Sequence, residues 1–111
     1  MAEDALAARV RRALSARRRI SEKRMFGGVC FLLRGNMLCG TSKARLMVRV
    51  GKQQHAAALG RTAARPMTFT GKSLQGFIWV GAKGYAGKGL KRWLALAERY
   101  VGKLPAKGKK A

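Results

Sequence analysis

Acidic side chains are scarce in this sequence. Its 111 residues contain 4 Asp and Glu against 25 Lys and Arg, which gives a formal net charge of +21 at pH 7. With two of the four carboxylates, Glu3 and Asp4, near the N-terminus, a catalytic pair of acids is not evident. The imbalance favours binding to nucleic acid or to an acidic protein, although a solvated basic surface explains it equally well.

Metal ligands and nucleophiles are few. His55 is the only histidine, and the cysteines are Cys30 and Cys39. They lack the close spacing of a metal site, and no signature places His55 beside a thiol. The Gly-Lys-Ser run at 71–73 is not a P-loop, because the motif's first glycine would fall at Pro66. We therefore expect no enzyme activity, no metal, no cofactor and no small-molecule substrate.

Long hydrophobic runs are also missing. No apolar stretch approaches the ~18 to 20 residues that cross a bilayer, and the N-terminus lacks the apolar core of a secretory signal. We therefore expect a cytoplasmic protein without membrane contact. The length fits one domain, residues 1–105, and the basic tail at 106–111 is expected to be disordered.

Three segments have helical periodicity. Apolar residues recur at four-residue intervals over 3–17, and the arginines from Arg17 to Arg19 follow as the cationic end of a helix. A short helix is predicted over 52–60 and a longer one over 90–104. The apolar stripe of this last helix consists of Leu90, Trp93, Leu94, Ala97, Val101 and Leu104.

Two apolar, β-prone runs, GGVCFLLR and NMLCGT, form a predicted hairpin. If Arg34 and Gly35 form the turn, Cys30 faces Cys39, whereas a turn one residue later separates the cysteines. Even an opposed pair would need strain to form a disulfide, so we expect two reduced core thiols, with a redox switch as the alternative. Both faces of the hairpin are apolar, so one should meet helices and the other more protein, within the sheet or in a dimer.

The segment RLMVRV alternates, with Leu46, Val48 and Val50 on one face and Arg45, Met47 and Arg49 on the other. The arginine face is solvated or binds an anion. PMTFT and QGFIWV give two further strands. The predicted fold is therefore α+β, one domain with a five-stranded, mainly antiparallel sheet flanked by an N-terminal helix, a short middle helix and a C-terminal helix.

The order of these motifs is typical of one family. From about Lys23 to Pro105, KRMFGGVCFLLRGNMLCG, RLMVRVG, ARPMTFTGKSLQGFIWVG and a helix with a Leu-x-x-Trp-Leu core follow one another. The chain resembles the N-terminal domain of the TfoX/Sxy family of bacterial competence regulators. The resemblance implies a compact α+β domain in proteins associated with transcriptional control of DNA uptake. The positions that match the family's motifs, expected to be structural, are Met25, Phe26, Gly27, Gly28, Pro66, Met67, Phe69, Gly76 and Phe77.

Two features depart from the family pattern. Full competence regulators of this kind carry a second, helical C-terminal domain. We expect these 111 residues to correspond to the first domain alone, so roles of the second do not transfer. The loop before the last helix tends to be acidic in the family but reads GAKGYAGKG here. Partners inferred from more acidic relatives therefore do not transfer either.

The sequence thus predicts a non-enzymatic regulatory domain that binds nucleic acid or an acidic partner through a basic surface. The alternative is a protein-interaction or dimerisation module that uses the second apolar face and binds no DNA. Tyr85 is the best candidate for an exposed stacking residue, since Phe26, Phe31, Phe69, Phe77, Trp79, Trp93 and Tyr100 have plausible core positions. The residues predicted to contact an anion are Arg11, Arg12, Arg18, Arg19, Lys83, Lys88, Lys91 and Arg92.

Overall fold

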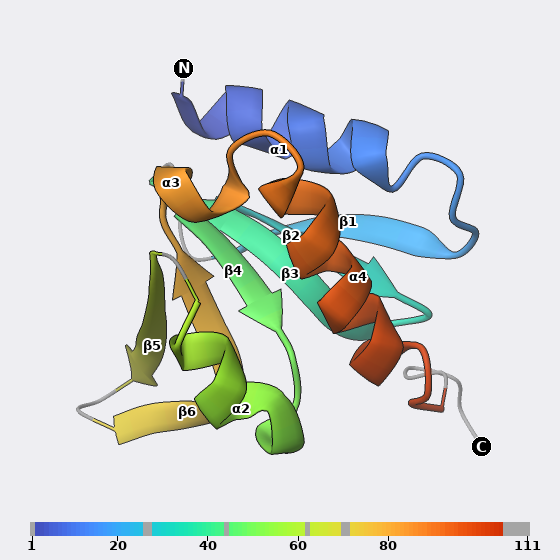
Figure 1. The fold of residues 1–111 in the computed structure, drawn as a ribbon. Helices are drawn as coiled ribbons and strands as arrows, with labels where there is room; N and C mark the ends of the chain where they lie inside the picture. The colour runs from blue at the N-terminus through green and yellow to red at the C-terminus, as the bar shows by residue number, and fades with distance from the viewer. Residues whose placement is uncertain (1, 26–27, 44, 62, 70–71, 106–111) are drawn as a thin grey trace.

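One antiparallel sheet runs through the protein. A computed structural model describes residues 2–25, 28–43, 45–61, 63–69 and 72–105 (Figure 1). In spatial order the strands are β1 (Ile20–Met25), β2 (Gly28–Leu33), β3 (Asn36–Ser42), β4 (Arg45–Arg49), β6 (Lys72–Val80) and β5 (Ala64–Phe69). The helices are α1 (Ala2–Ala13), α2 (Lys52–Leu59), α3 (Ala82–Tyr85) and α4 (Gly89–Val101). The predicted α+β class is confirmed, with six strands instead of five.

The sixth strand, β1, was not predicted, and the first helix ends four residues before the predicted residue 17. Helix α1 ends at Ala13, and Arg19 then takes a positive φ of 65° directly before β1 begins at Ile20. The sequence of β1, ISEKRM, gives little apolar signal because it forms one edge of the sheet. Charged side chains are common on such edges, where they discourage pairing with other chains.

The β2–β3 hairpin has the predicted turn but a different register. Arg34 and Gly35 form the turn with φ values of 51° and 85°. A bulge then places Phe31 opposite Cys39 and Cys30 opposite Gly40. The prediction that Cys30 faces Cys39 is therefore wrong, and so is the alternative of a turn one residue later. The bulge allows the consecutive residues Leu38 and Cys39 both to be fully buried.

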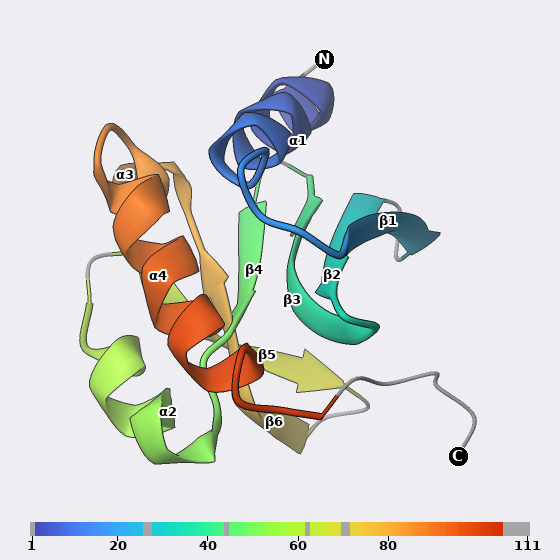
Figure 2. The same cartoon turned by 90° about the vertical axis from the view of Figure 1, so that its right-hand side faces the viewer.

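The helices lie on one side of the sheet. Figure 2 shows α2, α3 and α4 together on the left of the strands, and α4 packs on β3 and β4. This inner face carries Phe31, Val48 and Ile78, all completely buried against stripes from α1 and α4.

The predicted faces of β4 are confirmed for Leu46 and Val48, which are buried, and for Arg45, which is exposed. On the arginine face, however, Met47 is buried and Arg49 is half-buried, so that face is solvated only in part.

The opposite, outer face of the sheet carries a row of residues that lie directly opposite one another on neighbouring strands. Cys30, Gly40, Met47 and Trp79 follow one another across β2, β3, β4 and β6, and Arg65 continues the row on β5. Directly opposed residues of antiparallel strands point to the same side. Helices α2, α3 and α4 lie on the other side of the strands (Figure 2), yet Cys30 and Met47 are buried in this face.

Two glycines with positive φ bring β4 and β6 together at the start of α2. Gly51 and Gly76 have φ values of 87° and 89°, and a Cβ on Gly76 would lie 3.0 Å from the Gly51 carbonyl carbon. The Gly76 carbonyl accepts hydrogen bonds from Val50 N at 2.7 Å and Gly51 N at 3.2 Å. The Gly76 N–H donates to Nδ1 of buried His55 at 2.9 Å. His55 therefore supports this crossing as a hydrogen-bond acceptor.

The family-motif positions lie in the sheet. Met25 is in β1 and Phe69 is in β5, but their side chains are not among those described. Phe26, Gly27 and the tail at 106–111 lie outside the described residues. Pro66 is exposed on β5, the second edge strand, where a missing N–H is tolerated. The other positions are Gly28, buried at the start of β2, Met67 and Phe77, both half-buried, and Gly76.

None of the helices in the described part of the chain is long and apolar enough to cross a membrane.

Candidate anion-binding surface

A tight connector carries two of the predicted anion-binding lysines. It runs from Gly81 through α3 to Gly89, the first residue of α4. A Cβ on Gly89 would lie 2.2 Å from the Gly84 carbonyl oxygen, and Gly87 has a φ of 53°. The glycines thus permit close packing of α3 on α4. Lys83 and Lys88 are exposed on this connector.

One cavity, the Arg61 cavity, lies between the connector and the end of α2. It has a volume of about 630 Å³. Three of the predicted residues, Lys83, Lys88 and Arg92, line it together with Arg61. The Arg61 guanidinium lies 5.1 Å from the ring centre of buried Trp93, a cation–π distance. Four cations, two from α3 and α4 and two from the loops that follow α2 and α3, therefore border a single hollow.

A second cavity, the Arg9 cavity, lies between the connector and α1. Its volume is about 380 Å³, and it is bordered by Arg12 and Lys91, both predicted, and by Arg9. Arg9 Nη2 donates to the carbonyls of Tyr85 at 3.3 Å and Gly87 at 3.4 Å, which joins α1 to the connector. Tyr85 itself is half-buried and packs against the core, so it is not the exposed stacking residue that the sequence predicts.

Together the two cavities form one cationic surface. We call it the basic belt, and its residues are Arg9, Arg12, Arg61, Lys83, Lys88, Lys91 and Arg92. The described residues that line the two cavities include no Asp or Glu. An unneutralised cluster of this kind creates a positive potential that attracts anions.

The other predicted arginines lie elsewhere. Arg11 donates to both carboxylate oxygens of Glu22 on β1, at 2.6 and 2.7 Å. This hydrogen-bonded pair raises the pKa of Arg11 and lowers the pKa of Glu22. Arg18 and Arg19 are exposed in the loop between α1 and β1 and line neither cavity. Five of the eight predicted residues are therefore in the belt.

Arg9 and Arg61 belong to the belt but were not predicted. Arg9 is on α1 next to the buried Val10, and Arg61 follows the short helix α2. Only the fold brings these two positions beside residues 83–92. Arg9 could have been predicted from the sequence, since it lies one helical turn before Arg12, a predicted residue, and so shares a helix face with it.

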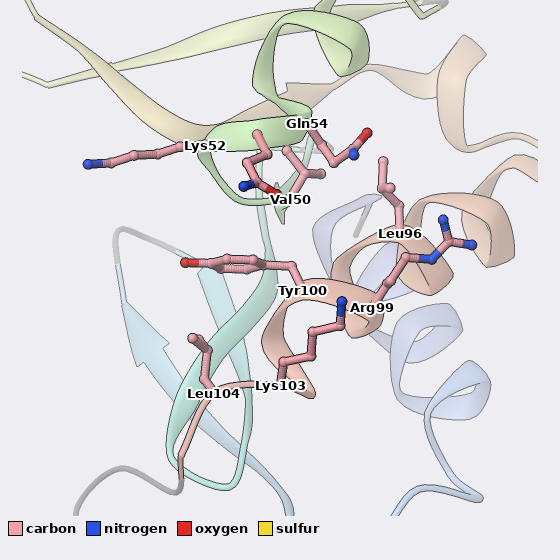
Figure 3. Close-up of a pocket in the computed structure, with 9 residues that line it drawn as sticks. Val50, Lys52, Gln54, Leu96, Arg99, Tyr100, Lys103 and Leu104 are labelled. Carbon is pink, nitrogen blue, oxygen red and sulfur yellow. The ribbon is translucent and has the colours of Figure 1, made fainter.

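A third hollow, the Tyr100 pocket, separates α2 from the end of α4. Figure 3 shows Tyr100, Arg99 and Lys103 below Lys52 and Gln54 of α2. The pocket has a volume of about 380 Å³. Its walls combine apolar side chains, among them Val50 and Leu96, with cations. None of its cations, Lys52, Arg99 and Lys103, was predicted from the sequence to contact an anion.

The residues examined for catalytic chemistry have structural positions. His55 is buried and accepts the Gly76 N–H. Burial raises the pKa of the Cys30 thiol to about 11 and raises the pKa of fully buried Cys39 further. The described residues contain no group of three or more His, Cys, Asp or Glu side chains that could hold a metal. Absence of enzyme activity stays a prediction.

Comparison with known proteins gives one match. A family model, the TfoX N-terminal domain, matches residues 4–100. No curated protein and no solved structure matches the chain. The matched range begins within α1, ends near the end of α4 and contains every residue of the basic belt. Because the match covers most of the 111 residues, the chain belongs to the TfoX N-terminal domain family.

Proposed function

We propose that this protein is a non-enzymatic regulatory domain that binds nucleic-acid phosphates through the basic belt, in the control of DNA uptake. The family supports a competence-related regulatory role. The observation that carries the proposal is the gathering of seven cations, without a described carboxylate, around the connector. Duplex DNA presents one negative charge per ~1.7 Å of helix axis and is the polyanion best matched to such a surface.

The belt contributes affinity without sequence readout. Lysine and arginine contacts to phosphates fix the position of a protein on nucleic acid but do not distinguish bases. Each neutralised phosphate releases counterions, so binding should weaken steeply as salt concentration rises. Sequence selection, where it occurs, then falls to a partner protein or to other parts of the surface.

An NMR amide titration with a short DNA duplex at ~150 mM salt tests the proposal. Weak binding at low salt follows from net charge alone, so the salt concentration matters. We expect shifts confined to α1, Arg61 and residues 81–92. Small shifts spread over all basic residues, or the absence of any shift, would refute phosphate binding by the belt. Either result would favour the alternative function, protein interaction through the outer sheet face.

Two double variants remove the same charge from different places. Lys88→Gln with Arg92→Gln removes two belt cations, whereas Arg18→Gln with Arg19→Gln removes two exposed cations outside both cavities. The belt variant should lower the slope of log affinity against log salt by about 2, while the control retains the wild-type slope. Equal slopes for both variants would show that net charge alone drives binding.

A further inference from the structure

A fourth cavity lies where β6 leads into α3, and the proposed function does not use it. It has a volume of about 550 Å³, within the range of small-molecule sites. We call it the Trp79 cavity. The side chains important for the argument are Trp79, Arg45, Arg65 and Lys83.

Sheet register places two arginines beside the Trp79 indole. Arg65 is directly opposite Trp79 on β5. Met47 is opposite Trp79 on β4, which makes Arg45, two residues earlier, its diagonal neighbour. Both positions are within reach of a large side chain on the same face. The Arg45 guanidinium carbon lies 4.0 Å from the indole centre, the shortest cation–π distance among the described residues.

The charges in this cavity are not neutralised by carboxylates in the described residues. The described residues form two ion pairs, Arg11 with Glu22 and Arg17 with Glu98. Neither pair involves a residue that lines the Trp79 cavity. Arg65 and Lys83 are exposed, and Trp79 is half-buried. The cavity therefore combines a planar stacked surface with two accessible cations.

We infer that the Trp79 cavity binds an unpaired nucleotide of a single-stranded nucleic acid. The base stacks on the Arg45–Trp79 pair, and Arg65 and Lys83 contact its phosphates. Unpaired bases stack on aromatic rings and on guanidinium planes, whereas bases within a duplex have both faces covered. An acidic peptide would satisfy the cations but would leave the stacked plane unused.

Lys83 connects this cavity to the proposed function. It lines both the Trp79 cavity and the Arg61 cavity, so a strand held by the belt can continue into the Trp79 cavity. The inference deepens the proposed function and rests on it in this respect. The two can still fail separately, because Trp79 is outside the belt and contributes no charge.

The test compares a fluorescently labelled thymidine decamer with a decamer of abasic nucleotides at ~150 mM salt by anisotropy. The two oligomers carry the same phosphates, so their difference in affinity measures base contacts. In Trp79→Leu we expect binding of the thymidine decamer to weaken about 5- to 150-fold. Affinity for the abasic decamer and for a duplex, and the salt slope, should not change.

Phe77→Leu is the matched control. Phe77 is a half-buried aromatic residue on the same strand and face, with Arg49 5.4 Å from its ring centre, but it does not line the cavity. It should retain the preference for thymidine over abasic nucleotides. An equal loss in both variants, an unchanged preference in Trp79→Leu, or an equal weakening of both decamers would overturn the inference.

Indole fluorescence gives a readout that does not depend on a destabilising variant. Trp93 is only 2% exposed, so a bound base should quench mainly Trp79. The thymidine decamer should quench the wild type but not Trp79→Phe, and quenching in both would overturn the site. Adenosine monophosphate is titrated in the same fluorescence assay. If it saturates the quenching of Trp79 at concentrations similar to those of the decamer, the cavity binds free nucleotides and the inference for nucleic-acid strands is overturned.

The belt variant separates the two proposals. If Lys88→Gln with Arg92→Gln leaves duplex binding unchanged but Trp79→Leu still removes the base preference, the proposed function fails and the nucleotide site stands. If the belt variant weakens duplex binding and Trp79→Leu has no effect on either decamer, the nucleotide site fails alone.

Discussion

At the scale of single residues, the interior of the sheet leaves no room for a side chain at one glycine and keeps two cysteine thiols away from water. Gly28 is the tightest case: a Cβ placed on it would lie 1.6 Å from the Thr41 carbonyl oxygen on the neighbouring strand. The sequence predicts that the glycines of the Met-Phe-Gly-Gly motif are structural. The sequence could not show that the Thr41 carbonyl oxygen excludes a side chain at position 28, because Thr41 belongs to another strand, β3, and reaches Gly28 only in the folded sheet.

Gly28→Ala should therefore destabilise the protein by about 3 kcal/mol or more, because a backbone atom cannot move aside without shifting β3. Chemical denaturation monitored by circular dichroism measures the change. Gly60→Ala is the control. Its φ is −79° and its added Cβ would meet only an ordinary contact at 3.5 Å, so it should be neutral or stabilise by about 0.4–1 kcal/mol. Similar losses in both variants would refute the proposed contact.

The two thiols should react slowly in the folded state. Burial raises the pKa of Cys30 to about 11, from an ordinary value of 9.0, so its reactive thiolate forms about two pH units higher than in the unfolded chain. At pH 8 we expect alkylation of Cys30 to be about 100-fold slower in buffer than in denaturant, and Cys39 to be slower still. Mass spectrometry of single-cysteine variants, Cys30→Ser and Cys39→Ser, measures each rate.

Rapid modification of Cys30 in buffer would contradict this burial. A redox switch would instead require the two thiols to form a disulfide on mild oxidation. Because Cys30 is opposite Gly40 and Cys39 is opposite Phe31, we expect both thiols to remain countable after that treatment.

At the scale of elements, periodicity in the sequence predicts where the core-facing helices and strands lie but not where polar edges begin. The stripes of α1 and α4 are visible because these helices bury one face, and the faces of β4 are visible because Arg45 and Arg49 mark the one that lies opposite Leu46 and Val48. Strand β1 buries little and is stabilised by pairing with β2, a long-range property without a local pattern. The hairpin bulge was missed for a related reason, since it is set by packing of Leu38 and Cys39 against the helices.

One contact between elements joins the β2–β3 turn to the end of α4. Arg34 Nη2 donates to the carbonyls of Gly102 and Leu104, and Asn36 Nδ2 donates to the Pro105 carbonyl at 2.8 Å. Asn36 is buried, so its amide donor has little access to water as a substitute partner. These bonds hold residues 102–105 against the hairpin.

Asn36→Ala should loosen this segment. Loss of the bond should increase local opening, so we expect amide hydrogen exchange at Lys103 and Leu104 to accelerate about 5- to 10-fold, equivalent to ~1 to 1.5 kcal/mol. Ser15→Ala, which removes an exposed hydrogen bond to the Arg12 carbonyl, should leave exchange at these amides unchanged. Unchanged exchange in Asn36→Ala would mean that Arg34 alone holds the segment.

At the scale of the whole molecule, the charge is easy to count from the sequence and hard to place. Lys83, Lys88 and Arg92 were predicted as anion contacts because they fall on the glycine-rich loop or on an outer helix face, and the fold does gather them. Arg9 and Arg61 join them only through packing of α1 and α2 around that loop. Trp79 was expected in the core because half-burial on an uncovered sheet face has the same apolar pattern as full burial.

A net charge of +21 should make the folded state repel itself, so added salt should stabilise it. Raising NaCl from ~10 to ~500 mM should increase Tm by about 4–8 °C, the shift expected for ~1 kcal/mol in a domain of this size. The two exposed ion pairs act in the opposite direction, but such pairs contribute little. Removing belt charge with Lys88→Gln and Arg92→Gln should raise Tm at low salt and reduce the salt increment more than Arg18→Gln with Arg19→Gln. A Tm that falls with salt would show that the ion pairs, and not the crowded cations, dominate the electrostatics of folding.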